Sequence, residues 1–155
     1  MSDFSIRRAA PRDLPAIVAL LADDELGAAR ETPGDLGPYR EAFAAIDADP
    51  HQLLVVAERD AEIIGTLQLT FLPGLSHRGA TRAQIEAVRV GGEMRGGGLG
   101  SGLIGWAVDE ARRRGCRMVQ LTSNASRTDA HRFYERLGFT ASHVGFKLAL
   151  EKAPE

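Results

Sequence analysis

Residues 85–106 read IEAVRVGGEMRGGGLGSGLIGW. The apolar, β-branched start of this stretch, Ile85–Val90, predicts a strand, and the glycines after it predict a tight turn that opens a helix near Leu99. A helix N-terminus has unpartnered backbone N–H groups and a partial positive charge, and glycines leave room for an anion because they have no Cβ. The stretch therefore predicts a binding site for a phosphate-bearing ligand, with a glycine-rich turn that binds nothing as the alternative.

The spacing inside the turn narrows the class of ligand. A P-loop needs a Lys-Ser/Thr pair at the end of its glycines, but Gly100 is followed by Ser101-Gly102 without a lysine. A dinucleotide fold has its glycine motif early in a βαβ unit, whereas this one lies two thirds of the way along the chain. The turn does fit the sequence motif Arg/Gln-x-x-Gly-x-Gly/Ala, whose fixed positions are Arg95, Gly98 and Gly100.

A second motif follows, in which Asn124 lies 24 residues after Gly100. Residues 121–124 (LTSN) end a predicted strand, and residues 130–139 (AHRFYERLGF) follow. The apolar side chains of this stretch recur at i, i+3, i+4 and i+7, which predicts a helix with one apolar face, and Gly138 is suited to end it. In this order and separation the two motifs resemble the pyrophosphate loop and the Ala-x-x-Phe-Tyr helix of the GNAT superfamily of acetyl-CoA-dependent N-acetyltransferases.

The resemblance covers nearly the whole chain and implies the fold. It implies an α/β domain with a central mixed, mostly antiparallel sheet flanked by helices, in which one pair of strands splays apart to admit the cofactor. A length of 155 residues predicts one domain over residues 1–155. The patterns predict strands over 4–8, 53–58, 62–71, 81–90 and 117–122, one or two closing strands within 139–150, and helices over 11–29, 39–48, 99–114 and 127–137.

Composition limits the partners. A net charge of −2 gives no electrostatic footprint for nucleic acid, and no apolar run reaches membrane length. The start of the chain has no signal-peptide pattern, so we expect a cytoplasmic protein that binds neither nucleic acid nor a membrane. The lone cysteine, Cys116, excludes an intrachain disulfide and reads as a packed thiol. The four histidines show no metal-site spacing, so we expect no metal.

The resemblance implies acetyl-CoA as the co-substrate and a set of residues that hold it. Main-chain groups of Val88 and Val90 would bind the pantetheine arm, with the Asn124 side chain as a partner and His131 nearby. Asn124 could instead form a turn, and His131 could be a partly exposed helix residue. The glycine turn would hold the pyrophosphate through Arg95, Gly96, Gly97, Gly98, Gly100 and Ser101.

Two residues are candidates for proton transfer. Tyr134 matches the family tyrosine that faces the thioester sulfur, and a phenol with a pKa near 10 can protonate a departing thiolate. The alternative is that Tyr134 only packs in the apolar stripe. A lysine-like amine is neutral only about once in 2,500 at pH 7, so a base is useful. Glu86, on the cofactor strand, is the candidate base, and a structural or ion-paired role is its alternative.

The combined interpretation is an N-acetyltransferase that moves acetyl from acetyl-CoA directly to a primary amine, most simply of a small molecule. A protein lysine or N-terminal amine is the alternative acceptor, and a non-catalytic acyl-CoA-binding module of the same fold is the alternative class. The resemblance implies an acceptor pocket made by the first two helices and variable loops, with the loops 32–38 and 72–75 as its expected walls. A homodimer is left open.

Overall fold

The computed structural model describes residues 3–151 and contains the alternation of strands and helices that the sequence predicts. Its strands are β1 (Ser5–Arg8), β2 (Gln52–Arg59), β3 (Glu62–Leu72), β4 (Arg82–Val90) and β5 (Met118–Leu121). Its α-helices are α1 (Leu14–Ala22), α2 (Glu25–Arg30), α3 (Gly37–Ala48), α4 (Ser76–Gly79), α5 (Leu99–Arg113) and α6 (Thr128–Arg136). Short 3-10 turns, η1 (Pro11–Asp13) and η2 (Gly92–Met94), precede α1 and α5.

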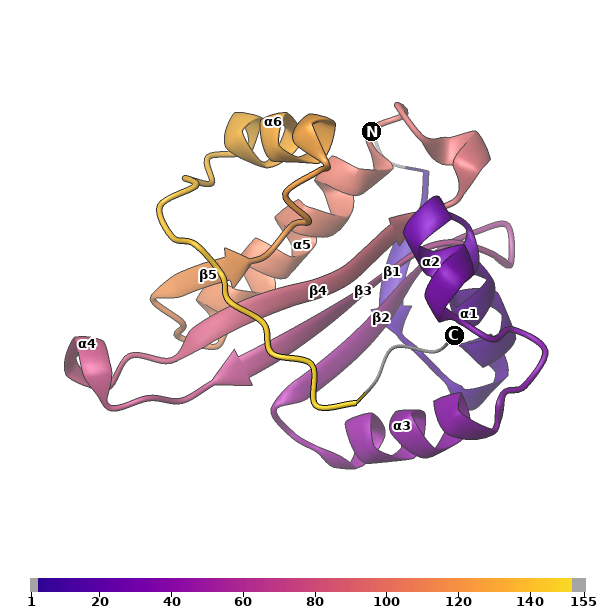
Figure 1. The fold of residues 1–155 in the computed structure, drawn as a ribbon, viewed down its shortest axis with the longest axis horizontal. Coiled ribbons are helices and arrows are strands. Elements are labelled where there is room, and N and C mark those ends of the chain that lie inside the picture. The colour runs from indigo at the N-terminus through magenta and orange to yellow at the C-terminus, as the bar shows by residue number, and fades with distance from the viewer. Residues whose placement is uncertain (1–2, 152–155) are drawn as a thin grey trace. The chain divides into compact units, whose positions relative to one another are not determined.

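The five strands form one mixed sheet in the order β1-β2-β3-β4-β5. The β1–β2, β2–β3 and β3–β4 pairs are antiparallel, and only β4–β5 is parallel (Figure 1). The β2–β3 connection is a tight turn in which Asp60 and Ala61 both have positive φ, as a two-residue hairpin of this twist requires. The predicted mixed, mostly antiparallel sheet is confirmed.

Strand β4 is irregular where it approaches the glycine turn. Ala87 has φ 53°, and the pairing with β3 shifts from Gln68↔Glu86 to Thr66↔Arg89, which is a β-bulge. Pairing with β5 covers only Arg82–Ile85, because β5 ends at Leu121. In the part of the chain that the structure describes, β4 therefore extends past its pairing with β5, and the splayed strand pair stays a prediction.

The two faces of the sheet carry different helices. Helix α5 packs on one face through a buried stripe, and Gly65 of β3 lies so close that an added Cβ would come within 3.1 Å of a Leu103 methyl group. On the opposite face, α1 and α3 build a second cluster around Ile17, Val18 and Phe43. Both faces are thus covered by apolar helix stripes, which is what an α/β layer requires.

The prediction of one continuous helix over residues 11–29 is wrong, because the structure has two helices there. The structure breaks it at Asp23 and Asp24, between α1 and α2. The Asp24 carboxylate accepts a hydrogen bond from Gly27 N, so Asp24 is the N-cap of a new helix. As a cap, the Asp24 carboxylate accepts a hydrogen bond from a backbone N–H group at the start of α2 that would otherwise lack a partner. The chain therefore turns at Asp24 and begins a new helix.

The closing strands predicted within residues 139–150 are also wrong, because these residues form neither strand nor helix. The prediction is based on alternating apolar side chains, but a strand also needs a neighbouring strand with which its backbone N–H and C=O groups form hydrogen bonds. The apolar side chains of this stretch are instead highly exposed: Val144, Phe146, Leu148 and Leu150.

The chain forms two compact units, Met1–Leu121 and Thr122–Glu155. The first contains the whole sheet with α1–α5, and the second contains α6. A single domain over residues 1–155 stays a prediction.

A buried ion pair fixes the entry to α1. The Asp13 carboxylate, only 5% exposed, accepts two hydrogen bonds from the Arg7 guanidinium at 2.7 and 2.9 Å and one from Ala10 N at 2.7 Å. Arg7 also donates to Glu58 at 2.7 Å. The hydrogen bonds from Arg7 lower the pKa of Asp13, against the opposing effect of burial. The network ties β1 and β2 to the start of α1.

We expect Asp13→Asn to destabilise the protein by about 2 kcal/mol, the usual scale for hydrogen bonds to a charged group. For a chain of this length that is roughly 4–8 °C in Tm. Because the folded pKa of Asp13 is lowered, its stabilisation is complete above the ordinary value near 3.8 and is lost as the pH falls through the folded pKa. The difference in unfolding free energy between wild type and variant should therefore be constant from pH 7 to 5 and shrink below about pH 4.

The matched control is Asp47→Asn. Asp47 pairs with Arg8 at 3.6 Å, and both side chains are about half exposed. Its loss should change stability by less than about 1 kcal/mol. Equal effects of the two variants in denaturant titrations would contradict the structural role of Asp13.

Candidate functional site

The glycine turn between β4 and α5 has the backbone of an anion site. Gly96 and Gly98 have φ of 83° and 85°, the left-handed region that favours glycine. Gly98 is the N-cap of α5, and the first hydrogen bond of the helix runs from Gly102 N to Gly98 O at 3.0 Å. The N–H groups of Leu99, Gly100 and Ser101 therefore precede the helical ladder and point out of its first turn.

The turn also leaves space in front of these donors. An added Cβ at Gly96 or Gly98 would meet no atom within 4 Å among the residues the structure describes. The helix dipole adds partial positive charge at the same point. Free donors, open space and favourable charge together fit a pyrophosphate group of the kind that acetyl-CoA carries.

Two acidic residues at the α1–α2 break face the arginines of this region. Asp24 lies 3.5 Å from Arg89 Nε, and Asp23 lies 3.8 Å from an Arg95 guanidinium nitrogen. The Arg95–Asp23 pair is more than half exposed on both sides, so it contributes little to stability. Arg95 is therefore held only loosely and can turn toward a phosphate, as the sequence motif predicts.

Glu86 lies on the sheet face opposite α5, in a cross-strand row of polar side chains. Its carboxylate accepts hydrogen bonds from Gln84 Nε2 at 3.1 Å and from Thr70 Oγ1 at 3.5 Å. Gln52 continues the row: its side-chain oxygen accepts from Gln68 Nε2 at 2.9 Å, and it lies 3.0 Å from Thr70 Oγ1, whose single proton can go either to it or to Glu86. Glu86 is exposed to solvent, and these hydrogen-bond partners are neutral. It is thus an accessible carboxylate on the strand that carries the bulge.

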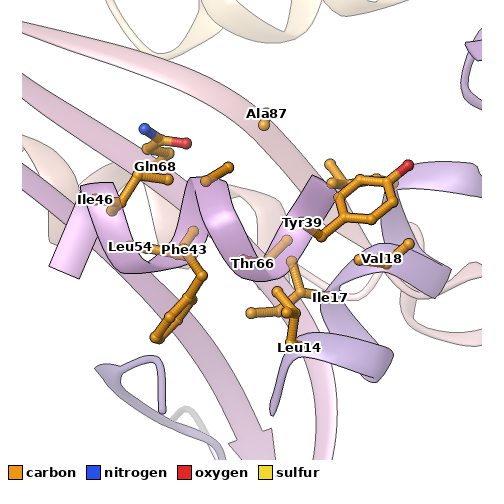
Figure 2. Close-up of a pocket in the computed structure, with 12 residues that line it drawn as sticks. Leu14, Ile17, Val18, Tyr39, Phe43, Ile46, Leu54, Thr66, Gln68 and Ala87 are labelled. Atoms are coloured by element: carbon orange, nitrogen blue, oxygen red, sulfur yellow. The ribbon is translucent and has the colours of Figure 1, made fainter. Parts of the chain in front are cut away.

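A cavity of about 160 Å³ lies between α1, α3 and the sheet, and its lining includes Gln68, which pairs in register with Glu86. Figure 2 shows Tyr39 and Val18 on one side of it and Gln68 and Ile46 on the other. Ala87, the bulged residue, also lines it. The full lining is Leu14, Ile17, Val18, Leu21, Tyr39, Ala42, Phe43, Ile46, Leu54, Thr66, Gln68 and Ala87.

The two helices that the sequence analysis expects at the acceptor pocket do line this cavity, as α1 and α3, but the expected loops do not. The loops expected to wall it, residues 32–38 and 72–75, contribute none of its lining. A signal was present, because Tyr39, Phe43 and Ile46 follow helical spacing, but that spacing equally predicts a face packed on the core. Only the structure shows that a space remains between this face and the sheet.

Asn124 and His131 lie in the second unit and contact each other's segment. The Asn124 side-chain oxygen accepts hydrogen bonds from Ser126 N at 2.9 Å and Ser126 Oγ at 2.7 Å, the pattern of an Asx turn. His131 Nε2 lies 2.9 Å from the Asn124 carbonyl oxygen. The turn-forming alternative for Asn124 is therefore present in the structure, and the cofactor roles of both residues stay predictions.

Tyr134 packs within the same unit against two aromatic rings. Its ring centroid lies 5.2 Å from that of Phe133 and 5.9 Å from that of Phe139, and both pairs are edge-on. Such pairs stabilise through the ring alone. The packing therefore fixes the ring whatever the hydroxyl does, and the predicted acid role rests on the motif.

The remaining reactive groups give no second site. Burial raises the pKa of the Cys116 thiol, which leaves less thiolate and fits a packed role. Among residues 3–151, no three His, Cys, Asp or Glu side chains are grouped so that they could hold a metal ion. Within the same residues, none of the helices has the length and apolar character needed to span a membrane.

Comparison with known proteins agrees with this geometry. The acetyltransferase (GNAT) family matches residues 14–139. The aminoalkylphosphonate N-acetyltransferase of Salmonella typhimurium is 34% identical over 148 residues, covering 94% of this chain and 90% of that protein. The L-methionine sulfoximine/L-methionine sulfone acetyltransferase of Pseudomonas paraeruginosa is 28% identical, covering 89% of this chain and 81% of that protein.

A solved structure extends the likeness to three dimensions. The crystal structure of a transcriptional regulator from Bacillus halodurans C-125 matches with a TM-score of 0.92 and 46% identity, covering 95% of this chain and 99% of that one. The family match spans both the glycine turn and the Phe133-Tyr134 helix. This chain therefore belongs to the GNAT family and is an acetyl-CoA-dependent N-acetyltransferase.

Proposed function

We propose that this enzyme transfers the acetyl group of acetyl-CoA directly to the primary amine of a small molecule. The observation that carries the proposal is the glycine turn, where backbone N–H groups at the start of α5 and open space lie at the end of a bulged strand. Acetyl-CoA supplies an acetyl group activated as a thioester, and the chain has to bind it and move two protons.

Each part of the chain has a role in this transfer. The turn at Gly98 and the Arg95 guanidinium bind the pyrophosphate, and the main chain at Val88 and Val90 binds the pantetheine arm. Glu86 takes a proton from the attacking amine, so that its nitrogen can form the new C–N bond. As the C–S bond breaks, Tyr134 gives its proton to the sulfur, and the second proton lost by the nitrogen restores the Tyr134 hydroxyl through solvent. Direct transfer needs no acyl-cysteine, in agreement with the raised pKa of Cys116.

The small-molecule acceptor is supported by the relatives and by the pocket. The Salmonella and Pseudomonas relatives are named for small amine-bearing compounds. The cavity between α1, α3 and the sheet has a volume of about 160 Å³, which suits the side group of a small molecule. A protein lysine or N-terminal amine remains the alternative, and acetylation of peptides in preference to free amines would favour it.

The test is the melting temperature with acetyl-CoA, ATP or NAD, followed by amine-dependent thiol release. At 100 times its Kd, a ligand adds about 2.7 kcal/mol, which is roughly 5–11 °C for a chain of this length. We expect this rise with acetyl-CoA alone. A rise with ATP or NAD instead, or none with any of them, would contradict the assignment of the turn.

The Gly98→Ala variant localises the binding. Alanine at a φ of 85° is strained by about 1–2 kcal/mol, and its Cβ would occupy the space in front of the donors. We expect acetyl-CoA to bind at least tenfold more weakly, so that the shift is about halved at the same concentration. Gly105→Ala, inside the same helix where a Cβ meets no atom within 4 Å, should keep the full shift.

A further inference from the structure

We propose that the acceptor is a primary amine with an uncharged, apolar substituent, and that this substituent enters the cavity between α1, α3 and the sheet. The inference rests on the proposed function, because it assigns the second substrate of the same reaction. It is carried by the lining of the cavity, by the partners of its few polar groups and by the position of Glu86 at its edge.

The walls of the cavity are aliphatic and aromatic. Leu14, Ile17, Val18 and Phe43 are each less than 9% exposed, so the deep part of the cavity is formed by the core itself. None of the lining residues is charged among those the structure describes. Placing a phosphonate or carboxylate against this surface would remove it from water without a cation to pair with.

The polar groups in the lining already have partners. Thr66 Oγ1 donates to Val55 O at 2.8 Å, and Gln68 Nε2 donates to Gln52 at 2.9 Å. The Tyr39 hydroxyl donates to Glu31 at 3.0 Å and accepts from Thr32 N at 2.8 Å. Because these donors are used within the protein, they offer little to an anionic substituent.

The Glu86 carboxylate is placed for the amine rather than for the substituent. Gln68 lines the cavity and pairs in register with Glu86 on the neighbouring strand, and Ala87 lines the cavity directly after Glu86 in the sequence. Directly opposite side chains on antiparallel strands lie about 5 Å apart at Cβ. An ammonium group at Glu86 can therefore be joined to an apolar group in the cavity by a linker of one to three bonds.

The size of the cavity limits the substituent. At about 160 Å³ it resembles an apolar cavity of ~150 Å³ that accommodates one benzene ring. The substituent that fits is thus a phenyl ring or a branched alkyl group of about four to six carbons. Phenethylamine and isopentylamine are amines of this kind.

The test compares acceptors with saturating acetyl-CoA by thiol release. From ethylamine to butylamine and isopentylamine, kcat/KM should rise about fourfold for each added methylene, since burying one is worth about 0.8 kcal/mol. Phenethylamine should exceed 2-aminoethylphosphonate at least tenfold. A flat series, or a preference for the phosphonate, would overturn the inference.

A substitution at the mouth of the cavity gives a readout that does not depend on transfer. Ala42 lines the cavity from an exposed position of α3, so Ala42→Trp should occlude it with little effect on folding. Ala44→Trp is the matched control, because Ala44 is exposed on the same helix and does not line the cavity. Calorimetric binding of phenethylamine should weaken at least tenfold in Ala42→Trp and not in Ala44→Trp.

Equal binding to both variants would overturn the cavity assignment even if the enzyme acetylates amines. Binding that is lost only in Ala42→Trp, without thiol release from any amine, would refute the proposed function and leave the cavity assignment standing. The two failures are therefore distinguishable.

Discussion

Replacing Tyr134 by Phe is expected to lower kcat by about 10²-fold or more, the usual scale for loss of a positioned proton donor. The substitution removes only the hydroxyl. The edge-on contacts with Phe133 and Phe139 at 5.2 and 5.9 Å involve the rings and should remain. The KM for acetyl-CoA should therefore change little, because the hydroxyl would act on the leaving sulfur and not on the phosphates.

Changing the thiol of the acetyl donor distinguishes an acid role of Tyr134 from a packing role. In an acetyl thioester whose thiol has a lower pKa, the thiolate can leave without being protonated. Such a donor should restore much of the kcat of Tyr134→Phe and should change the kcat of the wild type little. A packing defect would instead lower Tm and slow both donors equally. An unchanged kcat with acetyl-CoA would remove Tyr134 from the proton-donor role and leave it to the aromatic cluster.

The parts of the fold that the sequence predicted are those set by local chemistry. The helix after the glycines begins at Leu99 because Gly98 tolerates the left-handed conformation that starts it. The tight turn at Asp60-Ala61 follows from spacing, because only these two residues separate β2 from β3. In these cases the residue types and the spacing are sufficient, because the neighbours that decide the conformation are adjacent in the chain.

The parts that the sequence could not predict depend on residues far apart. The partners of Asp13 include Arg7, which itself holds Glu58 from 51 residues away. Nothing in the residue type of Ala87 indicates a positive φ, which arises from how β3 and β4 fit together. Residues 139–150 have the alternation of a strand but no described pairing, because alternation specifies a face and not a partner.

The candidate site also has one part that the sequence predicts and one part that it does not. Its phosphate-binding part lies in one continuous stretch and was predicted residue by residue, whereas its cavity is built from α1, α3 and three strands. Each wall residue reads as ordinary core when taken alone. The chemistry of the acceptor therefore enters only with the three-dimensional arrangement.

Replacing Glu86 by Gln should lower kcat/KM by about 10²–10⁴-fold at pH 7, if its carboxylate takes the proton of the amine. Glutamine keeps an oxygen that can accept from Gln84 and Thr70, so the polar row should remain and Tm should change little. Glu62→Gln is the control for charge, since it removes an exposed carboxylate from the far end of β3.

The dependence on acceptor pKa decides whether Glu86 acts as a base. Without a base, the variant has to use the neutral fraction of the amine, about one part in 2,500 at pH 7 for a pKa near 10.4. Its kcat/KM should then rise about tenfold per pH unit up to the pKa of the amine, and acceptors of low pKa should restore it more than they accelerate wild type. If Glu86 only binds the ammonium ion, the variant should raise KM at every pH and leave the slope of the profile unchanged. A parallel pair of profiles would therefore exclude the base role, and a water relay would have to take the proton from the amine.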